Sequence, residues 1–355
     1  MISRSKLIFF ALTFFKGTIR NHKTVSKSPA YKALLAFYSL FVVFVTTFLL
    51  YAGGFTTSIG AGMVFPDWPL SNGSLNPEGW LENQAMLAEH SHRLLGATIG
   101  LLTLTLAIWI WVKDSRKWMR ILAIASLVAV VLQGLLGGFR VLFNSLQFAM
   151  IHGCLAQVFL CMLVSIAAGQ SRWWFRELSF PPRGKAKIRG FGLVVCGLIF
   201  VQLIVAAIMR HSGAGLAIPT FPLTPEGGLI PEAWNFRVSI HFAHRAIALA
   251  IVAVYIYWAS RILTTKQLDG RIKLFCGIGL LLLFTQVTLG AMVIWTYRSP
   301  IPTTVHVIVG AFLFATTWLI TFFQYNPALK TALPTSEEKI ESVDFSEVST
   351  GQSHS

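Results

Sequence analysis

Charged side chains are scarce in this 355-residue chain, where they make up only 12% of all residues and just 14 are acidic. Apolar residues take their place, at 55% of the chain. A soluble globular domain carries about 25% charged residues, so this composition excludes a water-soluble fold. The short alternating strands of a membrane β-barrel are missing as well, which leaves helices that satisfy their own backbone hydrogen bonds in lipid.

Long apolar runs replace the missing charge. A helix needs about 20 residues to cross a bilayer roughly 30 Å thick. The sequence therefore predicts an all-α polytopic membrane protein with eight transmembrane helices, near 33–54, 89–112, 121–139, 148–169, 190–209, 238–260, 274–297 and 303–323. Cysteine is rare too, and all four cysteines fall inside these runs, so we expect no disulfide in the outer loops.

Basic residues set the expected topology. The net charge is +15, and most Lys and Arg lie before the first run, in alternate loops or in the tail. The positive-inside rule then places both termini in the cytoplasm, so we expect no nucleic-acid partner. Residues 1–32 are predicted to form a basic cytoplasmic segment at the membrane surface, with a signal or transit peptide as the alternative. The acidic, Ser-rich tail, 326–355, is predicted to be disordered.

The second half of the chain repeats the first at an offset near 153 residues. Such a repeat predicts two duplicated four-helix bundles, at 33–170 and 190–325, joined by a cytoplasmic linker at 171–189. The matched landmarks are Glu89-His90-Ser91-His92-Arg93 with His241-Phe242-Ala243-His244-Arg245, Gly60-Ala61-Gly62 with Gly213-Ala214-Gly215, Gln133 and Gly137 with Gln286 and Gly290, and His152 with His306.

Four histidines have matching positions in the repeat. His92, His152, His244 and His306 each lie in the first turns of a predicted helix that runs inward from the outer side. They should therefore lie at similar depth, as two pairs. Two imidazoles from facing helices suit the two axial positions of a heme iron. Zinc or copper requires three or four ligands at one point, so two hemes fit better.

Six arginines lie outside the basic loops, against the topology bias: Arg93, Arg140, Arg210, Arg237, Arg245 and Arg298. Heme propionates are anions that need charge-assisted partners. Arg93 and Arg245, which directly follow a candidate ligand in each half, are the strongest candidates for this role, and Arg140 and Arg237 are further ones. The alternative is that these arginines anchor the helix ends at lipid headgroups.

The two halves differ at one informative position. Three residues before the first candidate ligand, the N-terminal half has Glu89 and the C-terminal half has His241. A carboxyl group in an apolar pocket can exchange protons during a reaction, so Glu89 is the candidate catalytic residue. The alternative is a structural ion pair with Arg93, one turn later on the same helix.

These motifs together resemble the heme A synthase family over roughly residues 33–323. The resemblance implies a bacterial cytoplasmic-membrane enzyme of cytochrome oxidase assembly that oxidises the ring-D methyl group of heme O to a formyl group, through an alcohol and a gem-diol. It also implies that His92 and His152 hold heme O, while His244 and His306 hold a heme b that passes electrons. Heme O synthase and an electron donor are the implied partners. Many bacterial members have a cysteine where this chain has Phe65, so a thiol role in that loop is excluded here.

Two other functions compete with this one. A non-catalytic b-type membrane cytochrome that carries electrons between quinol and a partner also uses bis-histidine hemes, but it has no need for Glu89. A duplicated transporter would explain the repeat and the polar groups inside the membrane. Its sites would lie near the middle of the membrane, whereas these histidines gather toward one face.

Overall fold

Eight long helices make up most of the chain. The computed structural model describes residues 31–175 and 188–325, and within them eight helices are long and apolar enough to cross a membrane. These helices are α2 (Ala33–Ser58), α3 (Gln84–Lys113), α4 (Lys117–Leu142), α5 (Leu146–Gln170), α7 (Ile188–His211), α8 (Phe236–Thr264), α9 (Gly270–Trp295) and α10 (Pro300–Gln324). The short helix α6 (Arg172–Phe175) and the 3-10 turn η1 (Ala214–Leu216) accompany them. The predicted all-α membrane fold is confirmed.

Most helices extend about one turn beyond the uncharged run that predicted them, because capping residues set where a helix begins. The side-chain oxygen of Asn83 accepts hydrogen bonds from the N–H groups of Ala85 and Met86, at 2.9 and 3.1 Å, and so starts α3 before its apolar run. Asn235 starts α8 in the same way, accepting from Val238 at 3.0 Å. The two halves therefore use the same residue type to begin the helix that carries the first histidine.

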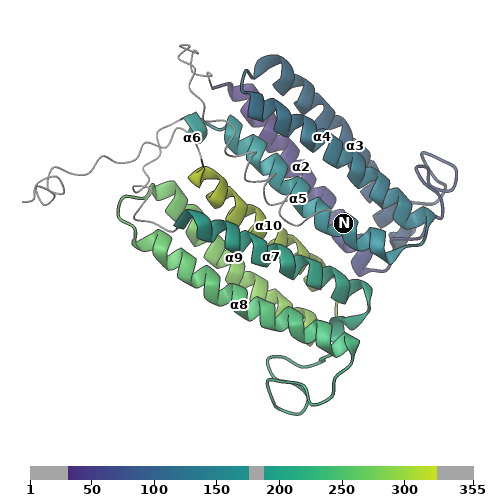
Figure 1. Ribbon diagram of the computed structural model, residues 1–355. Coiled ribbons are helices and arrows are strands. Elements are labelled where there is room, and N and C mark those ends of the chain that lie inside the picture. Colours follow the sequence, from purple (N-terminus) through teal and green to yellow (C-terminus); the bar gives the residue numbers. More distant parts are fainter. Residues whose placement is uncertain (1–30, 176–187, 326–355) are drawn as a thin grey trace, which may run out of the picture. The chain divides into compact units, whose positions relative to one another are not determined.

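Helices that follow one another in the sequence pack side by side in both halves (Figure 1). Helices α2 to α5 contact one another in a closed set, and α7 to α10 do the same. The sets also meet, because α10 contacts α2 and α5, while α5 contacts α7. Helices α5 and α10 are the most enclosed, with 44% of their apolar stretch buried against 22–28% for the others. Two bundles at 33–170 and 190–325 fit these contacts, but their independence as domains stays a prediction.

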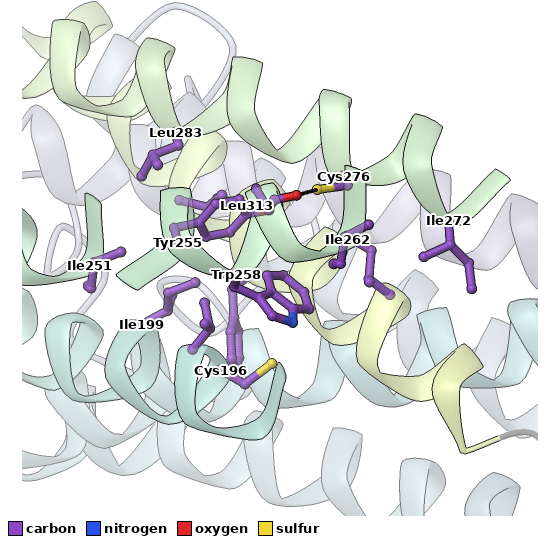
Figure 2. Close-up of a cluster of buried hydrophobic side chains, with 14 of the residues drawn as sticks. Cys196, Ile199, Ile251, Tyr255, Trp258, Ile262, Ile272, Cys276, Leu283 and Leu313 are labelled. Atoms are coloured by element: carbon purple, nitrogen blue, oxygen red, sulfur yellow. Dashed lines mark hydrogen bonds between the residues drawn. The ribbon is translucent and has the colours of Figure 1, made fainter. Parts of the chain in front are cut away.

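Large aromatic side chains fill the interior of the C-terminal set (Figure 2). Tyr255 and Trp258 of α8 are fully buried and pack against Ile199 of α7, Cys276 of α9 and Leu313 of α10. Between α5 and α10 the packing is different, since Leu160 meets the small residues Ala311 and Ala315. Small side chains let membrane helices approach closely, and such packing stabilises helix association in lipid, where the hydrophobic effect contributes little.

At the end of the N-terminal set opposite the histidines, an ion pair ties the α3–α4 turn to α5. The carboxylate of Asp114 accepts from Arg116 Nη2 at 2.6 Å and from Gln170 Nε2 at 2.8 Å, and Arg116 Nη1 donates to the Gly169 carbonyl at 2.8 Å. Burial raises the pKa of Asp114, but the hydrogen bonds from Arg116 and Gln170 outweigh burial, so the pKa lies below its ordinary value of 3.8. The buried charge is thus fully paired.

Three predicted segments lie wholly or partly outside the described residues. They are the basic segment 1–32, of which 31 and 32 are described, the linker 171–189 and the tail 326–355. In the linker, α6 follows directly after α5, and its Trp174 packs against Phe322 and Phe323 at the end of α10. The first residues of the predicted linker are therefore part of the packed structure.

Candidate functional site

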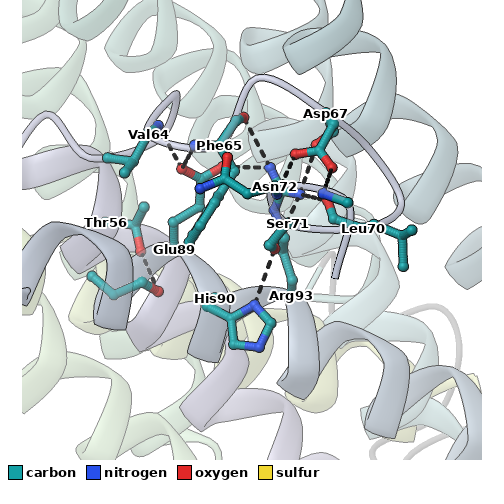
Figure 3. Close-up of polar contacts among 12 residues, drawn as sticks. Thr56, Val64, Phe65, Asp67, Leu70, Ser71, Asn72, Glu89, His90 and Arg93 are labelled. Atoms are coloured by element: carbon teal, nitrogen blue, oxygen red, sulfur yellow. Dashed lines mark hydrogen bonds and ion pairs between the residues drawn. The ribbon is translucent and has the colours of Figure 1, made fainter. Parts of the chain in front are cut away.

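The site begins where loop 59–83 folds over the first turns of α3, at the end of the helices that we call the loop end (Figure 3). Glu89 and Arg93 of α3 hold this loop in place. Glu89 Oε2 accepts from the N–H groups of Val64 and Phe65, at 2.7 and 3.1 Å. Arg93 donates to the carbonyls of Phe65, Asp67 and Leu70, at 3.2, 2.7 and 2.5 Å.

Glu89 and Arg93 also bind each other, with Oε1 and Nη2 separated by 2.7 Å. Glu89 is only 4% exposed, so its carboxylate is a buried charge that receives three hydrogen bonds. A buried carboxylate is tolerated when its charge is paired and its oxygens are satisfied. The ion pair that was the structural alternative for Glu89 is therefore present, while the proposed catalytic role of Glu89 stays a prediction.

The rest of the loop is closed by its own polar groups. Asp67 accepts from the N–H groups of Asn72 and Gly73, each at 2.7 Å. Burial raises the pKa of Asp67, but these backbone donors outweigh it, and the pKa lies below the ordinary value of 3.8. Buried His90 contacts Ser71 Oγ at 3.0 Å through Nδ1. This histidine therefore belongs to the contact between loop and helix, in agreement with its position off the Glu89 face.

Phe65, which stands where many bacterial relatives were expected to have a cysteine, is completely buried under the loop. Its ring lies 5.4 Å from the Arg93 guanidinium carbon and 6.0 Å from the His90 ring centre. An aromatic ring beside a guanidinium group contributes a cation–π attraction of about 0.5–2 kcal/mol. Loop closure in this chain rests on packing and hydrogen bonds, and all four cysteines are free.

The C-terminal half repeats this arrangement with an imidazole in place of the carboxylate. Arg245 Nη2 donates to the carbonyls of Ile218 and Thr220 at 3.0 and 2.6 Å, as Arg93 does in its own loop. His241 Nδ1 faces the Ile218 N–H at 3.2 Å, and its Nε2 faces Arg245 Nε at 3.2 Å. A neutral imidazole has only one acceptor nitrogen. One of these two donors is therefore left without an acceptor, unlike the donors around Glu89.

The four predicted ligand histidines form two facing pairs. The ring centres of His92 and His152 are 6.4 Å apart, and those of His244 and His306 are 6.5 Å apart. Two metal–imidazole bonds of about 2 Å, with about 1 Å from each nitrogen to its ring centre, place two ring centres roughly 6 Å apart. The spacing of both pairs thus fits two imidazoles on opposite sides of one iron.

The surroundings of these rings also fit ligands. The Nδ1 atoms of His92, His244 and His306 are buried without a hydrogen-bond partner, while His152 Nδ1 contacts the Gln133 carbonyl at 3.1 Å. Leaving a buried polar atom unpaired costs about 1–3 kcal/mol, so such rings are poor structural residues. Either nitrogen of a neutral imidazole can bind a metal. Within the described ranges no group of three or more His, Cys, Asp or Glu is arranged to hold a metal ion.

Glycines make room for three of the rings and explain some repeat landmarks. A Cβ atom at Gly53 would lie 2.7 Å from His92 Cε1. Added at Gly137 or Gly290, it would lie 3.4 Å from His152 Cε1 or 3.2 Å from His306 Cε1. Gly137 and Gly290 are the glycines that the sequence repeat matched, and both face the second histidine of their half. A Cβ atom would clash with the His92 ring at Gly53 and press on the His306 ring at Gly290, whereas at Gly137 it would only touch the His152 ring.

The predicted propionate ligands have different surroundings. The loop carbonyls occupy the Nη atoms of Arg93 and Nη2 of Arg245, so a propionate would share or displace those contacts. Arg140 is half-buried, and Arg237 is exposed. Their propionate roles stay predictions. The sequence analysis listed Arg210 without assigning it a role, although its position as a cation at the end of an apolar helix was a signal. Arg210 donates to the Gly54 carbonyl and to Ser58 Oγ of α2, each at 2.9 Å.

Comparison with known proteins identifies the family of this chain. The COX15-CtaA family model, described as "Cytochrome oxidase assembly protein", matches residues 33–318. The protein of Bacillus licheniformis named heme A synthase is 31% identical over 260 residues, which is 70% of this chain and 82% of that protein. The heme A synthase of Geobacillus kaustophilus is 29% identical over 256 residues, 70% of this chain and 78% of that protein.

A third relative extends the match. The heme A synthase of Alkalihalophilus pseudofirmus is 25% identical over 309 residues, which is 83% of this chain and 98% of that protein. The family match reaches from α2 into α10 and includes both histidine pairs and the Glu89–Arg93 ion pair. The chain therefore belongs to the COX15-CtaA family of cytochrome oxidase assembly proteins, the family of the heme A synthases.

Proposed function

We propose that this chain converts heme O to heme A, by oxidising the ring-D methyl group to a formyl group through a hydroxymethyl intermediate. The observation that carries the proposal is the pairing of four imidazoles into two facing sets, of which only the first has a carboxylate one turn away, at Glu89. Membership of a family whose curated relatives are named heme A synthases supports the same reaction.

The two pairs have different tasks in this proposal. His92 and His152 hold the substrate heme O, and His244 and His306 hold a resident heme b. Heme b supplies one-electron transfer when it is bound. The protein fixes each imidazole on a helix near the loop end, and the contact of His152 Nδ1 with the Gln133 carbonyl leaves Nε2 of that ring as the ligand nitrogen.

Glu89 is the proposed proton-transferring residue. Its three donors come from Val64, Phe65 and Arg93, and two of these are backbone groups of loop 59–83. A carboxylate has about four lone-pair sites and three donors occupy those of Glu89, so one site on Oε1 stays open to a proton. The loop N–H groups and Arg93 hold the carboxylate in place while this site exchanges the proton. His241 has no carboxylate to offer, which assigns the chemistry to the N-terminal half.

The proposed location is the bacterial cytoplasmic membrane, with the loop end outside and both termini in the cytoplasm. Lys and Arg at 113–120 and 261–273 support this orientation, because they lie at the helix ends opposite the loops. The change from methyl to formyl removes four electrons, so the proposed reaction also requires an oxidant. Its proposed partners are that oxidant, heme O synthase as the source of substrate, and an electron donor.

A non-catalytic b-type cytochrome is the competing function, since the His244–His306 spacing suits either role. The two functions are separated by the pigments of the purified full-length protein, extracted, chromatographed and identified by mass. The proposed enzyme yields heme b together with heme O or heme A, and a low-spin reduced spectrum. Recovery of heme b alone from cells that make heme O would favour the cytochrome.

Ligand variants test the heme assignment directly. His244→Ala and His306→Ala should each abolish the resident b-type signal, because a single imidazole is left on the iron. His90→Ala is the matched control, since His90 contacts the loop and faces neither pair. A folded but colourless wild-type protein from heme-replete cells would overturn the proposed function.

A further inference from the structure

Three arginines gather at the loop end where the two helix sets meet. Arg210, the next-to-last residue of α7, donates to Gly54 and Ser58 of α2 and so reaches into the other set. Ser58 also accepts from Thr304 of α10 at 2.9 Å. Gly54 adjoins Gly53, which packs against the His92 ring. Arg210 therefore binds the residue next to the glycine that packs against His92.

Arg140 and Arg298 take equivalent places in the two halves. Arg140, near the end of α4, lies so close to Gly62 that a Cβ atom added there would require its guanidinium group to move. Arg298, between α9 and α10, lies against Gly215, where a Cβ atom would be 3.3 Å from its Cδ. These glycines are the matched third residues of the two Gly-Ala-Gly turns. The arginines themselves are not at matched sequence positions, so the two halves place a guanidinium group there independently.

The cluster carries positive charge without a matching acid. Arg140 and Arg298 both interact electrostatically with Arg210, and Arg140 and Arg210 both interact with His211. Among the described residues the ion pairs of Glu89, Asp114 and Asp269 involve other arginines. Glu89 is close enough to act on Arg140, but among the described residues its ion pair is with Arg93. Arg140 and Arg210 are half-buried and Arg298 is exposed. Guanidinium groups gathered in this way favour a bound anion, and carboxylates suit their fork of donors.

Both histidine pairs lie near this cluster. The charge of Arg140 acts on His92 and His152, and the charge of Arg210 acts on His306. An anion between the pairs would therefore be close to both. Arg93 and Arg245 are less suited to the same task, because they hold the two loops closed.

We propose that Arg140, Arg210 and Arg298 form one shared carboxylate site, which takes the propionates of the tetrapyrroles held by both histidine pairs. The proposal rests on the proposed function and adds where the anionic groups bind. Because Arg210 joins the two sets, it serves both tetrapyrroles, whereas Arg140 serves the first pair and Arg298 the second. Anionic lipid phosphate is the other source of a ligand with this chemistry.

The test compares protoheme with protoheme dimethyl ester, which lacks the two carboxylates. Heme-depleted full-length protein in neutral detergent is titrated with each pigment, and absorbance gives both dissociation constants. His92→Ala restricts binding to the second pair, and His244→Ala restricts it to the first. The unsubstituted cluster should bind the free acid at least about tenfold more tightly than the ester, since a charge-assisted hydrogen bond is lost with each missing carboxylate.

Arginine variants then locate the preference. Arg210→Gln should reduce the ratio of ester to acid dissociation constants by about tenfold at both pairs, Arg140→Gln mainly at the first, and Arg298→Gln mainly at the second. Arg210→Lys should keep part of the preference, and Arg261→Gln should keep all of it, because exposed Arg261 lies in the last turn of α8, away from the loop end. The ratio is measured within one variant, so a general loss of stability weakens both pigments and leaves the ratio unchanged.

Three results would overturn the inference. Arg210→Gln and Arg298→Gln could weaken acid and ester equally, which makes the arginines structural. The variants could retain the full preference, which puts the carboxylates elsewhere. The unsubstituted cluster could show no preference, which leaves lipid phosphate as its ligand. In each case tight binding of either pigment through the histidines would still uphold the heme sites on which the proposed function depends, whereas failure of both to bind would remove both proposals.

Discussion

Glu89 and His241 occupy equivalent places, and their different hydrogen-bonding capacity separates the two halves chemically. A carboxylate accepts at both oxygens, so Glu89 satisfies Val64, Phe65 and Arg93 together. Neutral His241 accepts at one nitrogen while two donors face it. The first half thus has a carboxylate that satisfies every donor around it, whereas the second half has an imidazole that leaves one donor without an acceptor.

Glu89→Gln tests whether the carboxylate takes part in the reaction. The amide keeps the side-chain shape and an acceptor for the loop N–H groups, but it cannot transfer a proton. Heme A formed per bound heme should fall by about 10²–10⁴-fold, with heme O or its alcohol accumulating. The readout is product per occupied site by chromatography. If the variant instead loses heme occupancy while each bound heme turns over normally, Glu89 serves only to hold Arg93 and the loop.

His241→Glu tests the hydrogen-bond argument from the other side. A carboxylate there would accept from both Ile218 and Arg245, which should stabilise loop 212–235 by about 1–2 kcal/mol. Hydrogen exchange at the Ile218 amide, measured near neutral pH, should slow by about tenfold. His241→Gln is the matched control, because its amide offers one acceptor oxygen and no charge. Equal exchange in both variants would show that the second loop gains nothing from a carboxylate.

At the scale of elements, polar contacts at the helix ends fix the rotation and depth of each helix, which its apolar surface does not determine. Helices α3 and α8 begin at asparagine caps, and each then binds its own preceding loop through an arginine. At the opposite end, Asp114 and Arg116 join the α3–α4 turn to α5. Lipid-facing residues such as Phe37, Leu101 and Phe284 are 67–72% exposed and constrain neither rotation nor depth.

Asp114→Asn should destabilise the protein by about 3–5 kcal/mol at neutral pH, because Arg116 is left as an unpaired buried charge. The pKa of Asp114 is depressed in the folded protein, so its stabilising contribution is complete above the ordinary value of 3.8 and is lost as the pH falls through the folded pKa. Thermal unfolding in detergent should show a difference between wild type and variant that shrinks below pH 3.8. A difference that stays constant into that acidic range would contradict the assignment.

For the molecule as a whole, the two helix sets are joined at several levels. Trp318 Nε1 of α10 donates to Ser165 Oγ of α5 at 2.7 Å, Ala311 and Ala315 pack on Leu160, and Arg210 binds α2 near the loop end. Helices α5 and α10, which carry the second histidine of each half, are therefore the ones most enclosed by the other set. This arrangement keeps the two histidine pairs in one structure.

Labelling of introduced cysteines tests the proposed orientation of the whole molecule. Single cysteines at positions 70–80 or 224–232 should react with a membrane-impermeant thiol reagent added to intact cells, since both loops lie at the loop end. Cysteines at 176–186 should react only after the membrane is opened. The four native cysteines are first replaced, so that no background remains. Labelling of 176–186 in intact cells would invert the membrane orientation.

The chain's composition and repeat determined the membrane class, the eight helices and the grouping of four histidines, because hydropathy and helix direction depend only on local sequence. Helix bounds were less well predicted, since Asn83 and Asn235 extend α3 and α8 beyond the apolar runs. The sequence predicted that the histidines form pairs, but it could not predict the 6.4 and 6.5 Å distances between their ring centres.

What only the tertiary structure decided is how the charged groups are partnered. Sequence order marked Arg93 and Arg245 as candidate propionate partners beside the ligands, yet loop carbonyls from more than twenty residues away bind them. Arg140, Arg210 and Arg298 are distant in sequence and meet because four different elements end at one place. Hydrophobicity is a sum over neighbouring residues and can be read along a chain, whereas a hydrogen bond needs a donor and an acceptor that folding brings within about 3 Å.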